Sequence, residues 1–270
     1  MAEDIQPSTP HQIIRRRMTA FLNRRERWCA PLVKAVREIR ERRWQAFLFG
    51  GTPRGIYADG NSYSPRDIDI VMDDHAFAEL ESSYQQFIVR RNRFGGLHLI
   101  INRIPFDAWP LSKTWAFHNG HVRQASFEAL PRTTFLNIDA IAVELSPAPG
   151  RGRLLFEHGF FDGWMRRTLD VNLEINPYPA LCAIRSIYLS EFFHFNLSHR
   201  LATYIFRVFA EQGEDQLLEV QNSHYGRIIY DAAALKAIRV QLGSFLTHWD
   251  FGQVGIFPKT NDQMHLDAVA

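Results

Sequence analysis

The sequence has only two cysteines, Cys29 and Cys182, among its 270 residues. Two cysteines are too few for a disulfide framework or a cysteine-based zinc site. No apolar run approaches the length that spans a bilayer, and the polar segment Met1–Pro10 lacks a secretory hydrophobic region. Walker, kinase, nucleophile-elbow and Rossmann signatures are missing too. These absences predict a cytoplasmic protein without a membrane partner and exclude several common enzyme classes.

The chain also lacks a strong net charge, since its formal total is +2. Residues 1–45 contain 11 Lys and Arg against 5 Asp and Glu, a net of +6, which leaves −4 for the rest. The basic segment Ile13–Arg43 has apolar residues at helical spacing, which predicts two amphipathic helices broken near Pro31. Its arginines form either a solvated face on packed helices or a landing surface for a polyanion such as RNA.

The composition, with 46% apolar and 22% charged residues, is that of a soluble globular protein. After residue 43 the pattern is one of strands until about residue 175, and of helices thereafter. The predicted fold class is therefore α+β, a head with a mixed sheet and flanking helices followed by an all-α C-terminal region. The predicted divisions are residues 1–43, 44–175 and 176–270.

The expected head elements follow from alternation, turn residues and caps. Asp73 or Asp74 is expected to cap a helix, and Gly51–Pro65 reads as a long loop. The predicted strand segments are Trp44–Phe49, Arg66–Met72, a hairpin of Phe87–Arg93 with Leu97–Arg103, Ile104–Trp109 and the region Thr133–Leu145. The predicted C-terminal helices are Leu181–Phe195, Leu201–Glu211, a segment around Leu217–Val220, and Ala232–Leu246.

The most informative feature is a glycine pair, Gly50-Gly51, which ends an apolar strand and precedes Asp67-Ile68-Asp69-Ile70. Strand alternation places Asp67 and Asp69 on one face. Neighbouring carboxylates are suited to Mg²⁺, and glycines let backbone N–H groups approach phosphates closely. This combination predicts a nucleotidyltransferase with an NTP substrate.

A third carboxylate would complete a two-metal site, and Asp107 is the best candidate because it lies in an apolar strand. The alternative is that Asp107 pairs structurally with an arginine such as Arg103. Arg54 and Arg66 flank the expected phosphate site and either bind phosphate or bridge to a carboxylate. Ser64 is a further, weaker candidate for donating a hydrogen bond to phosphate.

These residues resemble the nucleotidyltransferase head shared by bacterial CCA-adding enzymes and bacterial poly(A) polymerases, within the DNA polymerase beta-like superfamily. That family has a strand ending in G-G-x-V-R-D and a turn leading to D-I-D-I. The resemblance covers about residues 44–195. The matching segments are Gly50–Gly55, Pro65–Ile70, Phe106–Leu111, Arg132–Ala142 and Asn176–Arg185.

The chain departs from the family pattern at several positions. Gly55 replaces the aspartate that follows the motif arginine, and Pro179 and Cys182 stand where the neck helix has arginines, leaving Arg185. No E-D-x-x-R segment for recognising the incoming base is found in the sequence. The resemblance thus implies metal chemistry in a divergent, minimal relative and leaves the base preference open.

The resemblance implies a site and a reaction. Two Mg²⁺ ions are expected on Asp67, Asp69 and Asp107, which are the expected catalytic residues. The expected nucleotide is ATP or CTP, and the expected acceptor is an RNA 3′ end of the tRNA type, reached through the basic N-terminal helices. Transfer to a protein or small-molecule hydroxyl, and a non-catalytic nucleotide-binding module, are the alternatives. The residues expected to bind the nucleotide are Gly50, Gly51, Arg54, Ser64, Arg66 and Arg185.

Overall fold

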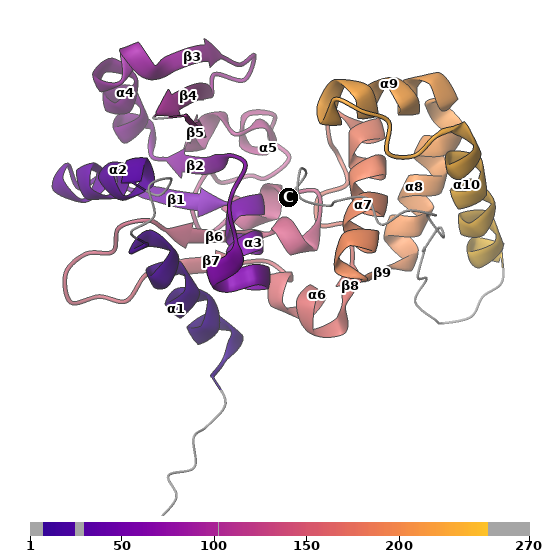
Figure 1. The fold of residues 1–270 in the computed structure, drawn as a ribbon, viewed down its shortest axis with the longest axis horizontal. Helices are drawn as coiled ribbons and strands as arrows, with labels where there is room; N and C mark the ends of the chain where they lie inside the picture. Colours follow the sequence, from indigo (N-terminus) through magenta and orange to yellow (C-terminus); the bar gives the residue numbers. More distant parts are fainter. Residues whose placement is uncertain (1–7, 25–29, 102, 248–270) are drawn as a thin grey trace, which may run out of the picture. The chain divides into compact units, whose positions relative to one another are not determined.

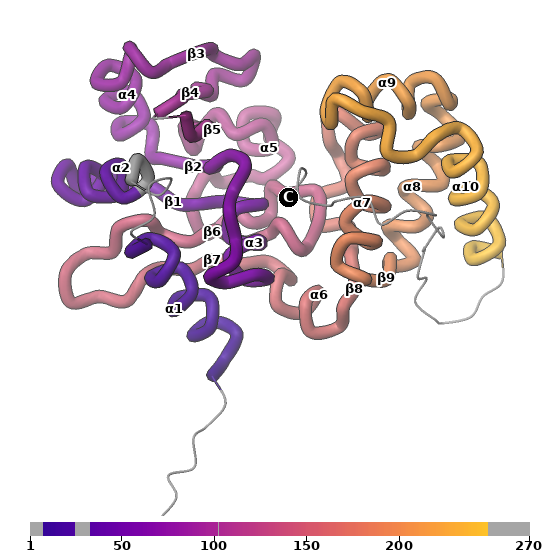
Figure 2. Tube along the Cα trace, in the orientation of Figure 1, coloured from indigo at the N-terminus to yellow at the C-terminus, as the bar shows by residue number. Residues whose placement is uncertain are grey.

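The computed structural model describes residues 8–24, 30–101 and 103–247. The chain divides into two compact units (Figures 1 and 2). The first, the head, contains the described residues up to Thr134 together with Asp139–His158. The second, the helical unit, contains Phe135–Ile138 and the residues from Gly159 onward.

A seven-stranded mixed sheet forms the centre of the head, in the order β3-β4-β5-β2-β1-β6-β7. Its neighbours pair antiparallel except β2 and β5, which run parallel. A parallel pair needs a long connection between its strands, and α4, β3 and β4 lie between β2 and β5 in the chain. The strands are β1 Ala46–Phe49, β2 Ile68–Met72, β3 Ile88–Arg91, β4 Leu97–Ile101, β5 Ile104–Pro110, β6 Ile141–Glu144 and β7 Leu155–Glu157.

Each face of the sheet has its own cover. On one face, Ile70 and Leu99 lie with Ile39 of α2 and Leu80 of α4 around a small apolar cavity. On the other face, Phe47, Val71 and Ala142 form a buried cluster with Phe117 and Leu130. The alternation of β2 and β5 therefore directs their polar residues toward this second face.

Local signals explain where the head helices begin. Thr9 and Gln12 form a capping box at the start of α1, and the Asp73 carboxylate accepts the Ala76 N–H at the start of α4. The predicted cap at Asp73 is thus confirmed. The helices of the head are α1 Pro10–Leu22, α2 Ala30–Glu41, α3 Gly51–Asp59, α4 Asp74–Ser83 and the short α5 Trp115–His118.

Two local predictions are wrong. The segment Gly51–Pro65 is not a long loop, because it forms α3 and then a 3₁₀ turn over Gly60–Ser62. Thr133–Leu145 is a strand only over Ile141–Glu144. Leu136 and Ile138 point instead into the core of the helical unit, where they are buried, so their apolar character does not report a strand.

The helical unit follows the predicted C-terminal pattern. Its helices are α6 Phe160–Arg166, α7 Pro179–Phe193, α8 His199–Glu211, α9 Glu214–Tyr225 and α10 Ala232–Thr247, with a parallel pair of short strands, β8 Thr168–Leu169 and β9 Asn196–Leu197. The predicted fold class, an α+β head followed by an all-helical region, is confirmed apart from this short strand pair. None of the described helices has the length and apolarity to cross a membrane.

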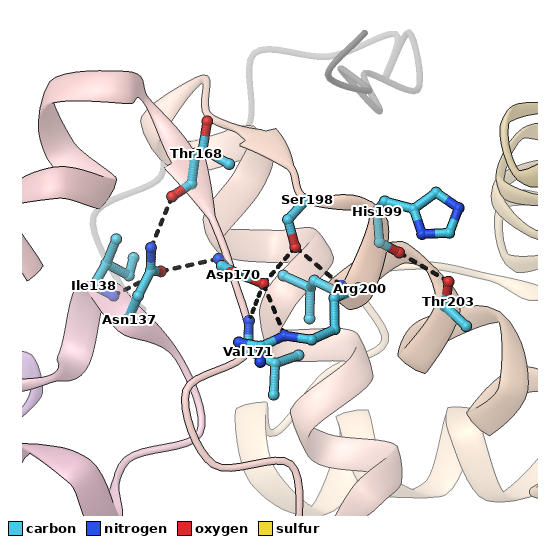
Figure 3. A network of polar contacts seen from close by, with 10 residues as sticks. Asn137, Ile138, Thr168, Asp170, Val171, Ser198, His199, Arg200 and Thr203 are labelled. Atoms are coloured by element: carbon cyan, nitrogen blue, oxygen red, sulfur yellow. Dashed lines mark hydrogen bonds and ion pairs between the residues drawn. The ribbon is translucent and has the colours of Figure 1, made fainter. Parts of the chain in front are cut away.

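A polar network fastens the start of α8 to the preceding segments (Figure 3). The Asp170 carboxylate accepts hydrogen bonds from the Ser198 hydroxyl at 2.5 Å and from Arg200 Nε at 3.3 Å. Ser198 in turn caps α8 by accepting the Leu201 N–H. Asn137 accepts the Asp170 N–H at 3.0 Å. The segment 135–138 is thereby tied into the helical unit.

Candidate functional site

The glycine pair forms the turn between β1 and α3. Gly50 has φ +66° and ψ −118°, a conformation that residues with a Cβ rarely adopt, although no atom lies within 4 Å of where that Cβ would be. Backbone conformation, rather than crowding, therefore requires glycine here. Helix α3 starts at Gly51 without a side-chain cap, so its first-turn N–H groups are of the kind that bind phosphate.

Thr52 joins this turn to the carboxylate strand. Its side chain is buried, and its hydroxyl donates to the Asp67 backbone carbonyl at 3.3 Å. The hydrogen bond fixes the first turn of α3 beside the residue that precedes β2. The two halves of the predicted site, the glycine turn and the Asp-x-Asp segment, are thus neighbours in space.

The structure brings Asp69 and Asp107 together. They are register partners on the parallel strands β2 and β5, so their Cα atoms are separated by about one strand spacing, roughly 4.8 Å. Register partners project from the same face of a sheet. The third carboxylate predicted from sequence therefore lies next to the Asp-x-Asp segment.

Asp67 and Asp107 each have a cationic or protonatable neighbour. The Asp67 carboxylate accepts from Arg66 Nη2 at 2.9 Å, and its side chain is 32% exposed. Asp107 Oδ1 lies 2.7 Å from His98 Nδ1. The alternative of an Arg103 pairing is wrong, since the neighbour of Asp107 is His98 of β4 in direct register. An ionised carboxylate only accepts, so Nδ1 of His98 carries the hydrogen.

The chemistry of this donor set fits a hard divalent cation. Carboxylate oxygens are the ligands that Mg²⁺ prefers, and neighbouring strands hold two of them side by side. Within the described part of the chain, no group of three or more His, Cys, Asp or Glu side chains is already arranged to hold a metal. The Asp67 carboxylate is paired with Arg66.

Arg54 lies behind the glycine turn. Its side chain, 7% exposed, forms an ion pair with Asp139, which is 14% exposed. Asp139 belongs to the Arg132–Ala142 segment whose family resemblance the sequence indicated. The pair connects α3 to the residues just before β6. This is the carboxylate-bridging alternative considered for Arg54, and its phosphate-binding role remains a prediction.

Tyr63 explains the glycine that replaces the family aspartate after Arg54. A Cβ on Gly55 would lie 2.0 Å from Cε2 of the buried Tyr63 ring, so the helix can pass the ring only with glycine there. Burial raises the pKa of Tyr63 to about 12, and the nearby Arg54 charge opposes that shift. The Tyr63 side chain is therefore uncharged at neutral pH and packs against α3 at Gly55.

The remaining predicted site residues are more scattered. Ser64 and Arg66 are exposed in the segment before β2. Arg185 is half-buried on α7, in the helical unit rather than the head. Sequence reasoning assigned no role to His98, Tyr63 or Asp139. Strand alternation places His98 on one face of its hairpin arm but gives no hint of its pairing with Asp107.

Two basic residues, Arg17 of α1 and Arg24 just after its end, form hydrogen bonds within the head. Arg17 donates to the backbone carbonyls of Tyr57 and Ala58 at the end of α3. Arg24 donates to the carbonyls of Tyr63, at 2.7 Å, and Gly60. These bonds satisfy carbonyls at a helix end. Neither arginine belongs to a purely solvated face, because both are hydrogen-bonded to the backbone of the head.

Comparison with solved structures identifies a class of fold. A CCA-adding enzyme bound to CTP superposes with a TM-score of 0.60 at 15% identity, over 86% of this chain and 55% of that one. The Thermotoga maritima CCA-adding enzyme complexed with tRNA gives 0.59 at 16%, over 84% and 54%. A tRNA nucleotidyltransferase with a primer tRNA and an incoming ATP analog gives 0.52 at 15%, over 68% and 54%.

The likeness shows the fold: the part of this chain that superposes has the same fold as the corresponding part of the CCA-adding enzymes. The resemblance predicted from sequence is thus confirmed at the level of fold. The chain spans about half the length of these solved structures. Its sequence matches no protein-family model and no curated protein.

Proposed function

We propose that the protein is a metal-dependent nucleotidyltransferase that moves a nucleoside monophosphate from an NTP to the 3′ hydroxyl of an RNA. The observation that carries the proposal is the register pairing of Asp69 with Asp107, beside a glycine turn that opens a helix. Carboxylates on neighbouring strands and an uncapped helix start match the two needs of the reaction, cation binding and phosphate binding. The solved neighbours include structures with CTP, an ATP analog and tRNA.

The chain's own groups would divide the work of binding. The N–H group of Gly51 would donate to the terminal phosphates of the NTP. Gly50 would shape the turn, because its own N–H already donates to the Ile141 carbonyl at 3.2 Å. Arg54, which is ion-paired with Asp139, would complete this phosphate-binding end of the site. Arg66 is exposed and ion-paired with Asp67. It can exchange the Asp67 carboxylate for a phosphate oxygen of the NTP. Ser64 completes the proposed nucleotide-binding set within the head.

Asp67, Asp69 and Asp107 would hold two Mg²⁺ ions, which supply charge neutralisation at the attacking and leaving oxygens when bound. In the reaction, the acceptor hydroxyl loses its proton to solvent and its oxygen bonds to the α-phosphorus. The bond from that phosphorus to the bridging oxygen breaks, and pyrophosphate leaves. The protein contributes by positioning the reactants and by stabilising charge that develops in the transition state.

His98 would act as a positioning residue. Its Nδ1–H hydrogen bond at 2.7 Å fixes one oxygen of Asp107. This leaves the other oxygen as the ligand atom, because a carboxylate held by one donor has restricted rotation. A hydrogen bond of this kind, made to a ligand by a neighbouring side chain, orients that ligand in metal sites.

The decisive experiment compares wild type with Asp69→Asn and Asp107→Asn, which keep the side-chain shape but weaken cation binding. Each protein is incubated with Mg²⁺, total RNA and one α-³²P-labelled NTP at a time. Asp162→Asn is the matched control, because that carboxylate is exposed and pairs only locally with Arg166 on α6. Labelled RNA is the readout, resolved on a denaturing gel.

We expect labelled RNA with wild type and the control, and at least about a 100-fold loss in both site variants. The estimate follows because losing a metal ligand removes several kcal/mol of transition-state stabilisation and 1.36 kcal/mol is tenfold in rate. Near-normal transfer by either variant would refute the assigned site. Label on protein or on a small molecule instead of RNA would refute the RNA acceptor while keeping the transfer chemistry.

A further inference from the structure

A single polar row crosses four neighbouring strands of the head. Asp69 of β2 is in register with Asp107 of β5, Asp107 with His98 of β4, and His98 with Arg90 of β3. Register partners share a face of the sheet, so all four side chains project from the same side. The row starts at the proposed metal ligands and ends at an exposed arginine on the edge strand.

A β-bulge is what brings Arg90 into this row. Ile88 is opposite Leu99, but the register shifts before Arg90, which is opposite His98. Without the extra residue, Val89 would stand opposite His98 and Arg90 would turn to the other face. Bulges commonly re-aim a side chain at a sheet edge near an active site. Because of this shift in register, Arg90 rather than Val89 is the residue paired with His98.

Arg90 and its neighbour Arg91 have opposite environments. Arg91 is in register with the buried Leu97, forms an ion pair with Glu81 of α4, and donates to the Gly95 carbonyl at 3.1 Å. The side chain of Arg90, by contrast, has no hydrogen bond or ion pair to any residue in the described ranges. The hairpin also carries Arg93 and Arg103, and residues 82–106 contain no Asp or Glu. Among the residues that the structure describes, Glu81 is the carboxylate that pairs with an arginine of this hairpin, Arg91.

We propose that Arg90 binds the backbone phosphates next to the 3′ end of the RNA acceptor. Arg90 is two strand spacings from Asp107, so the two Cα atoms are about 10 Å apart. At that distance the Arg90 side chain can contact the nucleotides of the RNA that precede the reacting 3′ hydroxyl. A guanidinium contacts a phosphate with two parallel hydrogen bonds. The β3–β4 hairpin is then the acceptor surface, rather than the region of α1, where Arg17 and, just after the helix, Arg24 are bonded within the head. This assignment rests on the proposed function for the identity of the acceptor.

The test measures RNA binding directly. A short single-stranded RNA with a 5′ fluorophore and a free 3′ hydroxyl is titrated with protein at several salt concentrations and followed by fluorescence anisotropy. Arg90→Gln should reduce the slope of log affinity against log salt concentration by about 0.7, which is the contribution of one phosphate contact with a single strand. Between 1 M and 0.1 M salt, a difference of this size in the slope is about fivefold in affinity. The loss should be equal for oligo(A) and oligo(C), because phosphate contacts carry no sequence information.

Arg91→Gln is the matched control, since it removes the same charge from the adjacent residue on the opposite face. We expect it to retain the wild-type slope, and Arg90→Lys to retain most of it. Equal slopes for wild type and Arg90→Gln, equal losses in both glutamine variants, or no RNA binding by wild type would each overturn the proposal. A change confined to ATP affinity would do so too, by assigning Arg90 to the nucleotide.

The same samples separate this inference from the proposed function. If wild-type protein binds RNA through Arg90 but transfers no label, the proposed transferase function is refuted and the RNA-binding role of Arg90 stands. Wild-type protein that transfers label while Arg90→Gln binds and reacts normally would refute the inference alone.

Discussion

Gly55→Ala is a substitution that should destabilise the head, although the same change stabilises most helices. Gly55 lies in the interior of α3, where alanine is normally favoured over glycine by about 0.5–1 kcal/mol. Here the new methyl group would lie 2.0, 2.4 and 2.5 Å from three carbons of the Tyr63 ring. The ring is 6% exposed and packs beside Phe21, with ring centroids 6.1 Å apart, so it has little room to withdraw.

Two opposing terms set the size of the effect. Overpacking in a close-packed core costs about 1–3 kcal/mol, and contacts this short favour the upper half of that range. Subtracting the helix gain leaves a net destabilisation of about 1–2.5 kcal/mol. In a Tyr63→Ala background the clash disappears, and Gly55→Ala should then stabilise by about 0.5–1 kcal/mol. The coupling between the two sites is therefore about 2–3 kcal/mol.

The measurement is urea unfolding of the four proteins of this double-mutant cycle, followed by fluorescence of the head tryptophans Trp44, Trp109 and Trp115. The change of sign is the decisive outcome. If Gly55→Ala stabilises the wild-type background, or destabilises both backgrounds equally, the Tyr63 ring is not what requires glycine at this position.

Three further predictions concern the head and the helical unit. Asp139→Ala should lower the free energy of unfolding by about 3–5 kcal/mol, because it removes the carboxylate that balances the buried Arg54 charge; little loss in urea titrations would show the pair to be dispensable. His98→Ala should lower kcat for transfer more than it raises KM for the NTP, and His98→Asn, whose amide can replace Nδ1–H toward Asp107, should restore it; no rescue would contradict a positioning role. Burial raises the pKa of Glu191 from 4.5 to about 7, so the folded state binds more protons than the unfolded state between these pH values. The stability should thus fall as the pH rises from about 4.5 to about 7, and Glu191→Gln should flatten that slope.

The carboxylates were accessible to sequence reasoning because their signal is local. Asp67 and Asp69 alternate with apolar residues, and Asp107 lies in a strand that is otherwise apolar. A charge in such a strand has few explanations other than a ligand or a partner. The structure shows a partner for Asp107, the hydrogen-bonded His98, and places a second carboxylate, Asp69, in register with it.

Helix α3 was missed because its sequence opposes helical propensity. Gly51, Pro53 and Gly55 within nine residues read as a loop. Proline is tolerated in a first turn, where its absent N–H has no partner to lose. Gly55 is required by the Tyr63 ring, a contact between residues whose proximity cannot be read from local periodicity. Tertiary packing thus overrides propensity here.

The bulge at Val89 and the Arg54–Asp139 ion pair were inaccessible for a related reason. A bulge has no fixed residue signature at this position, and one residue of slip changes which side chain faces the site. The two partners of the ion pair are 85 residues apart in the chain. Long-range pairings of this kind emerge only from the assembled sheet.

The pairing of β2 with β5 separates a part of the head whose geometry is constrained from a part whose length and charge can vary. The distance between Asp69 and Asp107 is fixed by backbone hydrogen bonds between adjacent strands. Residues 73–103, which include α4 and the basic hairpin, form an excursion from that pair and return to it. Its length and charge can drift, or be exchanged for those of another head, while the spacing of the two acids stays the same. The segment that carries the proposed acceptor surface can therefore be exchanged without changing the backbone that spaces the two acids.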